Sequence, residues 1–82
     1  MDPQAVQELI QQGLPDASVR VVSPDNTHFE ALVVSASFEG QRRIQRHQMV
    51  YRTLGERVGR EIHALSLQAL TPDELRARQS GG

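Results

Sequence analysis

Three histidines, His28, His47 and His63, are the residues of this sequence best suited to metal or proton chemistry near neutral pH. The sequence contains no cysteine, so a metal or cluster ligand has to come from histidine or a carboxylate. No pair of histidines has zinc-site spacing, and no serine or glycine stands in a nucleophile elbow or a phosphate loop. The sequence therefore predicts a binding module rather than an enzyme.

The three histidines differ in their predicted surroundings. His28 opens a predicted strand beside a polar turn, and either an ordinary exposed histidine or a ligand fits that position. His47 lies on the apolar stripe of a predicted helix, which favours a ring packed against the sheet over a ligand; we expect its removal to lower stability. His63 begins a predicted strand on its more apolar face, where it would be an ordinary histidine at the edge of the core.

The basic residues are unevenly distributed, because Arg42, Arg43 and Arg46 all fall within one predicted helix. A solvated helix face is the favoured interpretation, and the alternative is a contact with nucleic-acid phosphate or an acidic partner surface. The formal net charge of -1 lacks the strongly basic character of a nucleic-acid binder. Any DNA binding through these arginines should be weak and sensitive to salt.

The elements that must position these residues follow from caps, turns and apolar periodicity. Asp2 and Pro3 suit the start of a helix, which Gly13 in a left-handed conformation is predicted to end. Residues 18–22 and 28–37 are predicted strands, joined by a turn-rich segment and therefore antiparallel.

The second half of the chain follows the same logic. Residues 41 to about 58 are predicted to be helical, with an apolar stripe of Ile44, His47, Tyr51, Leu54 and Val58 that Val50 widens. Residues 61–69 are a predicted strand. Thr71 and Glu74 form a predicted capping box for a last helix, and residues 79–82 should fray.

The resulting order is α-β-β-α-β-α, in one α+β domain that covers residues 1–82. The helical crossover allows the third strand to lie parallel to the second, so we expect a three-stranded mixed sheet with helices packed on one face. No apolar run is long enough to span a membrane, and no signal-peptide pattern is present, so a cytoplasmic location is the default prediction.

Several short blocks of the sequence, taken in order, resemble the BolA family, and the resemblance covers about residues 2–76. The blocks are His28-Phe29, Val33-Val34-Ser35, Phe38-Glu39-Gly40, Arg46-His47-Gln48-Met49-Val50-Tyr51, Ile62-His63-Ala64-Leu65-Ser66 and Thr71-Pro72-Asp73-Glu74. The short turn between the first two strands is most similar to the compact bacterial branch of the family.

The resemblance implies a fold akin to the type II KH domain and a monothiol glutaredoxin as partner, with a [2Fe-2S] cluster shared between the two proteins. It makes His63 the principal ligand, while glutaredoxin and glutathione supply thiolates. The family's second ligand comes from the turn before the second strand, where His28 is the only candidate here. The isolated chain is expected to hold no cofactor and to be a monomer or weak homodimer.

The alternative that the resemblance implies is a DNA-binding transcriptional regulator. A KH-like surface permits this function, and Arg42, Arg43 and Arg46 would be its contacts. The Gly-x-x-Gly loop with which KH domains clamp a nucleic-acid backbone is absent, since Gly40 is followed by Gln41 and Arg42. DNA binding therefore ranks second.

Overall fold

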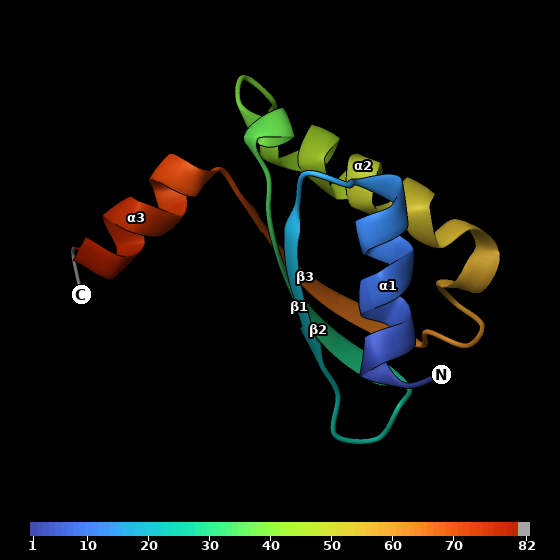
Figure 1. Ribbon diagram of the computed structural model, residues 1–82. Helices are drawn as coiled ribbons and strands as arrows, with labels where there is room; N and C mark the ends of the chain where they lie inside the picture. Colours follow the sequence, from blue (N-terminus) through green and yellow to red (C-terminus); the bar gives the residue numbers. More distant parts are fainter. Residues whose placement is uncertain (81–82) are drawn as a thin grey trace.

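A computed structural model describes residues 1–80 and has the predicted order of elements (Figure 1). The helices and strands are α1 (Pro3–Gly13), β1 (Ser18–Val22), β2 (His28–Val34), α2 (Arg43–Leu54), β3 (Ala64–Leu70) and α3 (Pro72–Ser80). Two single 3₁₀ turns, η1 (Ala36–Phe38) and η2 (Gly55–Arg57), flank α2. None of the helices in residues 1–80 is long and apolar enough to cross a membrane.

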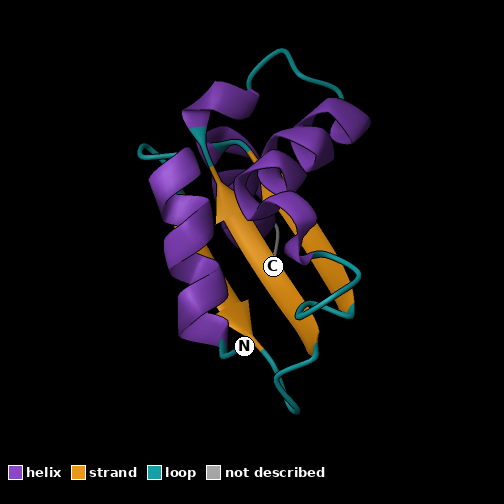
Figure 2. Cartoon of the chain, turned by 90° about the vertical axis from the view of Figure 1, so that its right-hand side faces the viewer, coloured by secondary structure: helices purple, strands orange, loops and turns teal. Residues whose placement is uncertain are grey.

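The sheet has the order β1-β2-β3, with β2 in the centre. β1 runs antiparallel to β2, and β3 runs parallel to β2 with His28 opposite Ala64. Both pairings were predicted and are confirmed, as is the α+β class. Helices α1 and α2 cover one face of the sheet, which faces the viewer in Figure 2.

The third helix departs from the expected one-sided packing. α3 leaves the end of β3 and projects away from the face that α1 and α2 cover (Figure 1), and none of its residues is buried. Its predicted capping box is present: the Thr71 N–H donates to Glu74 Oε1 at 2.9 Å, and the Glu74 N–H donates to Thr71 Oγ1 at 3.1 Å. The helix includes Gln79 and Ser80, where fraying was predicted; residues 81–82 lie outside the described residues.

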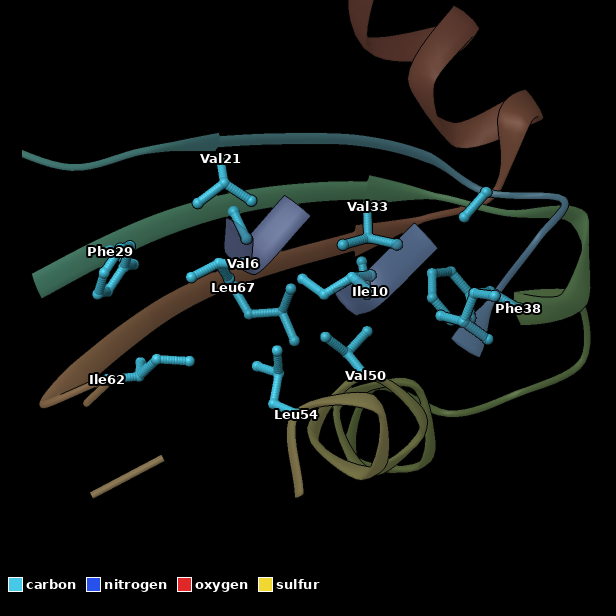
Figure 3. Close-up of a cluster of buried hydrophobic side chains, with 14 residues drawn as sticks. Val6, Ile10, Val21, Phe29, Val33, Phe38, Val50, Leu54, Ile62 and Leu67 are labelled. Atoms are coloured by element: carbon cyan, nitrogen blue, oxygen red, sulfur yellow. The ribbon is translucent and has the colours of Figure 1, made fainter. Parts of the chain in front are cut away.

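The core lies between the sheet and the two packed helices (Figure 3). Alternate residues of β2 point into it, as the pattern predicted: Phe29, Ala31 and Val33 are all buried. Val21 of β1 and Leu67 of β3 also point into it. The helices and the segments beside them contribute Val6, Ile10, Phe38, Val50, Leu54 and Ile62. This small core fixes the positions of β2 and β3, and hence of the residues at their ends.

Several predicted boundaries were too long. β2 ends at Val34 because Ser35 caps the following 3₁₀ turn, where its Oγ accepts the Ser37 N–H at 3.0 Å. α2 ends at Leu54 because Gly55 adopts a φ of 60°, which is left-handed. β3 begins at Ala64, so His63 precedes the strand instead of standing within it.

Gly13 does not have the left-handed conformation that was predicted for it, since positive φ occurs at other glycines. Its lack of a side chain serves packing instead. A Cβ atom at Gly13 would overlap the side chain of Thr53 on α2. The glycine therefore allows α1 and α2 to approach each other closely.

The predicted apolar stripe of α2 is confirmed only in part, because Leu54 and the adjoining Val50 are buried but other members of the stripe are not. Val50 and Leu54 are fully buried, whereas Ile44 is 62% exposed and Tyr51 is 37% exposed. His47 shares the Ile44 and Tyr51 side of the helix, so its ring is only partly buried and does not pack beneath the sheet. The buried stripe is rotated around the helix relative to the prediction.

Candidate functional site

Two histidines meet at one corner of the sheet, where β2 and β3 both begin. His28 is the first residue of β2, and His63 directly precedes β3; the His63 N–H donates to the Thr27 carbonyl at 2.8 Å. Their ring centroids are 5.3 Å apart with an interplanar angle of 76°, and both residues are exposed. Parallel pairing brings the two imidazoles together, as the sequence predicted.

An aspartate that sequence reasoning missed holds the His28 ring. Asp25 Oδ2 lies 2.7 Å from His28 Nδ1, and Asp25 Oδ1 accepts the backbone N–H groups of His28 and Thr27 at 2.8 and 3.0 Å. These hydrogen bonds lower the pKa of Asp25 well below its usual range, the His28 N–H contributing most, so the carboxylate is charged at neutral pH. An aspartate three residues before a histidine in a turn was the available signal.

This contact determines which nitrogen of His28 is available. In the neutral ring, a proton on Nδ1 would be donated to Asp25, and Nε2 would then carry the lone pair. Thr27 Oγ1 also lies 3.1 Å from Nδ1, so the polar partners of the ring gather around that nitrogen. The turn therefore presents Nε2 of His28 as the potential ligand atom.

The His63 ring forms no hydrogen bond with any residue among 1–80, and it packs edge-on against His28. Across those residues, no group of three or more histidine or acidic side chains is arranged to hold a metal ion. The corner thus offers two imidazoles: a carboxylate holds the ring of His28, and the ring of His63 contacts that of His28.

His47 is not brought to this corner. It lines a cleft with Arg43 and residues 67–70 of β3, at the opposite end of that strand from His63. Its ring centroid is 6.5 Å from that of Tyr51. Partial burial, followed by the charge of Arg43, lowers the pKa of His47.

The three candidate arginines also separate. Arg42 and Arg43 are exposed near the start of α2. Arg46 instead donates from Nη1 to Glu74 Oε1 at 2.6 Å and to the Ala69 carbonyl at 3.1 Å, and its side chain is only 14% exposed. Its guanidinium also lies 6.0 Å from the ring of Phe38. Arg46 ties α2 to β3 and α3, so it is not free to contact phosphate.

The comparison with known families settles which family this fold represents. The sequence matches the family model described as BolA-like protein over residues 6–74. The chain belongs to the BolA family. The corner formed by His28 and His63 is therefore a feature of a BolA domain, and the resemblance seen in the sequence is confirmed.

Individual BolA proteins support the assignment. The DNA-binding transcriptional regulator BolA of Haemophilus influenzae is 44% identical over 52 residues, which cover 63% of this chain and 50% of that protein. Human BolA-like protein 1 is 48% identical over 50 residues, 61% of this chain and 36% of that protein. The match thus spans half or less of these curated relatives.

A solved structure agrees over a longer range. The BolA protein homologue from Coxiella burnetii has 41% identity and a TM-score of 0.77, with 93% of this chain and 97% of that chain covered. The α+β fold described here is thus the fold of a solved BolA homologue.

Proposed function

We propose that this BolA domain binds a monothiol glutaredoxin and shares a [2Fe-2S] cluster with it, with His63 as the principal ligand of this chain and His28 as the second. The observation that carries the proposal is the pair of exposed imidazoles with centroids 5.3 Å apart. The glutaredoxin partner comes from the BolA resemblance, which also implies thiolates from glutaredoxin and glutathione.

The donor set of the corner fits such a shared cluster. Two irons held in the usual way by four cysteine thiolates have four protein-derived ligands, and imidazoles replace two of them in Rieske centres. This chain supplies two imidazoles and no thiol, so a partner would have to complete the set. Bound there, the cluster would supply one-electron redox chemistry or cluster transfer.

The residues of the chain have distinct tasks in this proposal. His63 and His28 must be neutral to donate a lone pair, so cluster binding should weaken as pH falls. Asp25 is a positioning residue, because its hydrogen bond to Nδ1 presents Nε2 of His28. The exposure of both rings leaves room for a second protein to approach the corner.

The test is substitution of each histidine by alanine, followed by cluster reconstitution with a monothiol glutaredoxin and a visible-region spectrum. His63→Ala should abolish the spectrum of the mixed complex, and His28→Ala should weaken or shift it. His47→Ala is the matched control, because it removes an imidazole at the other end of β3 and should leave the spectrum unchanged. An unaltered spectrum for His63→Ala would contradict the ligand assignment.

A second candidate function is DNA binding, favoured by the similarity to the Haemophilus influenzae relative, a DNA-binding transcriptional regulator. In this chain Arg42 and Arg43 would be the phosphate contacts, since Arg46 is engaged with Glu74. Binding of a labelled duplex measured by anisotropy should be weak and fall steeply with salt. Tight, sequence-specific binding at physiological salt would reverse the order of the two candidates.

A further inference from the structure

β3 is an edge strand, and its outer side is open. Within residues 1–80 the sheet ends at β3, with β2 on one side and no strand on the other. The Ser35 N–H donates to the Leu70 carbonyl at 3.0 Å, which places the even-numbered backbone groups of β3 toward β2. Since these groups alternate along a strand, those of Leu65, Leu67 and Ala69 point outward.

A cleft of about 300 Å³ follows this edge. Residues 67–70 form its floor, Arg43 and His47 of α2 line one side, and Arg78 of α3 lines the other. The Ala69 carbonyl already accepts a hydrogen bond from Arg46, so this carbonyl is not available to pair with another strand. The outward groups of Leu65 and Leu67 and the N–H of Ala69 remain for a partner strand.

The rim of the cleft is positively charged. In the part of the chain that the structure describes, ion pairs join His28 to Asp25, Arg46 to Glu74, and Arg76 to Asp73. Arg43 and Arg78 take part in none of these pairs, although Arg78 donates to Gln68 Oε1 at 2.9 Å. Both arginines line the cleft, Arg43 from α2, which covers one face of the sheet, and Arg78 from α3, which projects away from that face (Figure 1).

We propose that this cleft binds an extended acidic peptide segment of a partner protein, which adds a fourth strand along the outer edge of β3. Backbone hydrogen bonds to Leu65, Leu67 and Ala69 would supply affinity, as in other cases of strand addition. Successive side chains of an added strand point to opposite faces, so two consecutive acidic residues would meet Arg43 and Arg78 respectively. The inference is independent of the proposed cluster, because it uses the outer backbone edge of β3 and the arginines of the cleft, and neither imidazole of the histidine corner.

Two other occupants fit the cleft less well. Single-stranded nucleic acid is generally bound by aromatic side chains that stack on its bases, but Phe29 and Phe38 are buried and Tyr51 does not line the cleft. A second copy of this chain, paired edge to edge through β3, would bring two sets of unpaired arginines together. An acidic extended segment satisfies both the backbone groups and the charge.

The experiment uses a fluorescein-labelled peptide of about six residues, long enough for one strand, with two consecutive glutamates flanked by threonines so that one glutamate points to each face. Binding is followed by anisotropy, and amide NMR spectra locate the site. We expect the largest shifts, and slowed hydrogen exchange, at Leu65, Leu67 and Ala69. Methylation of alternate peptide nitrogens keeps the charge but removes strand hydrogen bonds, and should weaken binding about tenfold.

The protein variant R43Q/R78Q should also weaken binding about tenfold. R52Q is the matched control, since Arg52 is exposed on α2 but does not line the cleft, and it should bind like the unaltered protein. Equal binding of the methylated peptide, shifts confined to other residues, or no binding at millimolar peptide would each overturn the proposal. Stronger binding of an oligothymidylate probe at the same residues would also overturn it in favour of nucleic acid, and dimerisation through this edge would overturn it in favour of self-association.

Discussion

The two long sides of α2 both carry apolar residues, but one side is buried and the other is exposed. Val50 and Leu54 are fully buried against the sheet and α1, whereas Ile44, His47 and Tyr51 line the exposed side. Spacing by three and four residues fits both stripes, so periodicity alone does not decide between them. Burial follows from how closely the neighbouring elements approach, and single substitutions on the two sides should therefore differ widely in cost.

The largest difference should appear between Leu54→Ala and Ile44→Ala. Leu54 is fully buried, so its truncation leaves a cavity and should lower the free energy of unfolding by about 3 kcal/mol. Ile44 is mostly exposed, and its truncation should cost less than about 0.5 kcal/mol. Urea unfolding of the two variants measures both values, and similar losses would show that α2 packs with the sequence-predicted stripe.

The next effect should come from Arg46, at the margin between the two sides of α2. Arg46→Met keeps much of the apolar stem but removes the hydrogen bonds to the Ala69 carbonyl and to Glu74, so we expect a loss of about 2 kcal/mol in the free energy of unfolding. Arg76→Met is the matched control. Its ion pair with Asp73 is well exposed, and its loss should cost less than about 0.5 kcal/mol.

Acid should reveal the same contact. Hydrogen bonds from Arg46, followed by that from the Thr71 N–H, lower the pKa of Glu74 to about 2 from its ordinary value of 4.5. The stability that this carboxylate contributes is therefore present above pH 4.5 and is lost as the pH falls from there toward about 2. Arg46→Met should lose less stability than the unaltered protein over this interval. If the melting temperatures of the two proteins fell equally with pH, the assignment would be contradicted.

A smaller effect should come from the contact between α1 and α2. Gly13→Ala introduces a methyl group that overlaps Thr53, and we expect a net loss of about 1 kcal/mol despite alanine's better helix propensity. Thr53→Ser removes the interfering methyl but keeps the hydroxyl, which donates to the Val50 carbonyl at 2.6 Å. In that background Gly13→Ala should cost less, although the Cβ of residue 53 still lies close to the added methyl. An unchanged penalty in thermal melts would show that the contact is not the cause.

Much of the fold was predictable because local signals and the global structure agree. Alternation along β2 gave the buried positions Phe29 and Val33, and the length of the crossover implied the parallel β3. The N-cap of α1 is also as predicted, with Asp2 Oδ1 accepting the Ala5 N–H at 2.9 Å. In each case the residues that decide the outcome lie close together in the sequence or repeat at a fixed period.

The features that sequence reasoning missed depend on distant partners or on subtle turn geometry. Arg46 binds Glu74, 28 positions later, and Gly13 meets Thr53, so neither role is visible in a local window. The adjacency of His28 and His63 followed from strand pairing, whereas the role of Asp25 required the detailed conformation of the turn. Topology places the candidate ligands, and the turn orients one of them.

The smallest effect should come from His47, on the exposed side of α2. Partial burial, then the charge of Arg43, lowers its pKa below the ordinary value of 6.5, so the fold favours the neutral ring. Its contribution to stability is present above pH 6.5 and declines as the pH falls below that value, because the unfolded chain then binds the proton more readily.

His47→Gln should therefore change stability little near neutral pH but reduce the loss of stability on mild acidification. Melting temperatures of both proteins at about pH 7.5 and 5.5 measure this difference in pH dependence. Arg43→Gln is the control and should flatten the profile only in part, because burial remains. A large loss of stability for His47→Gln at neutral pH would instead support the sequence-based prediction of a partly buried ring that packs against the sheet.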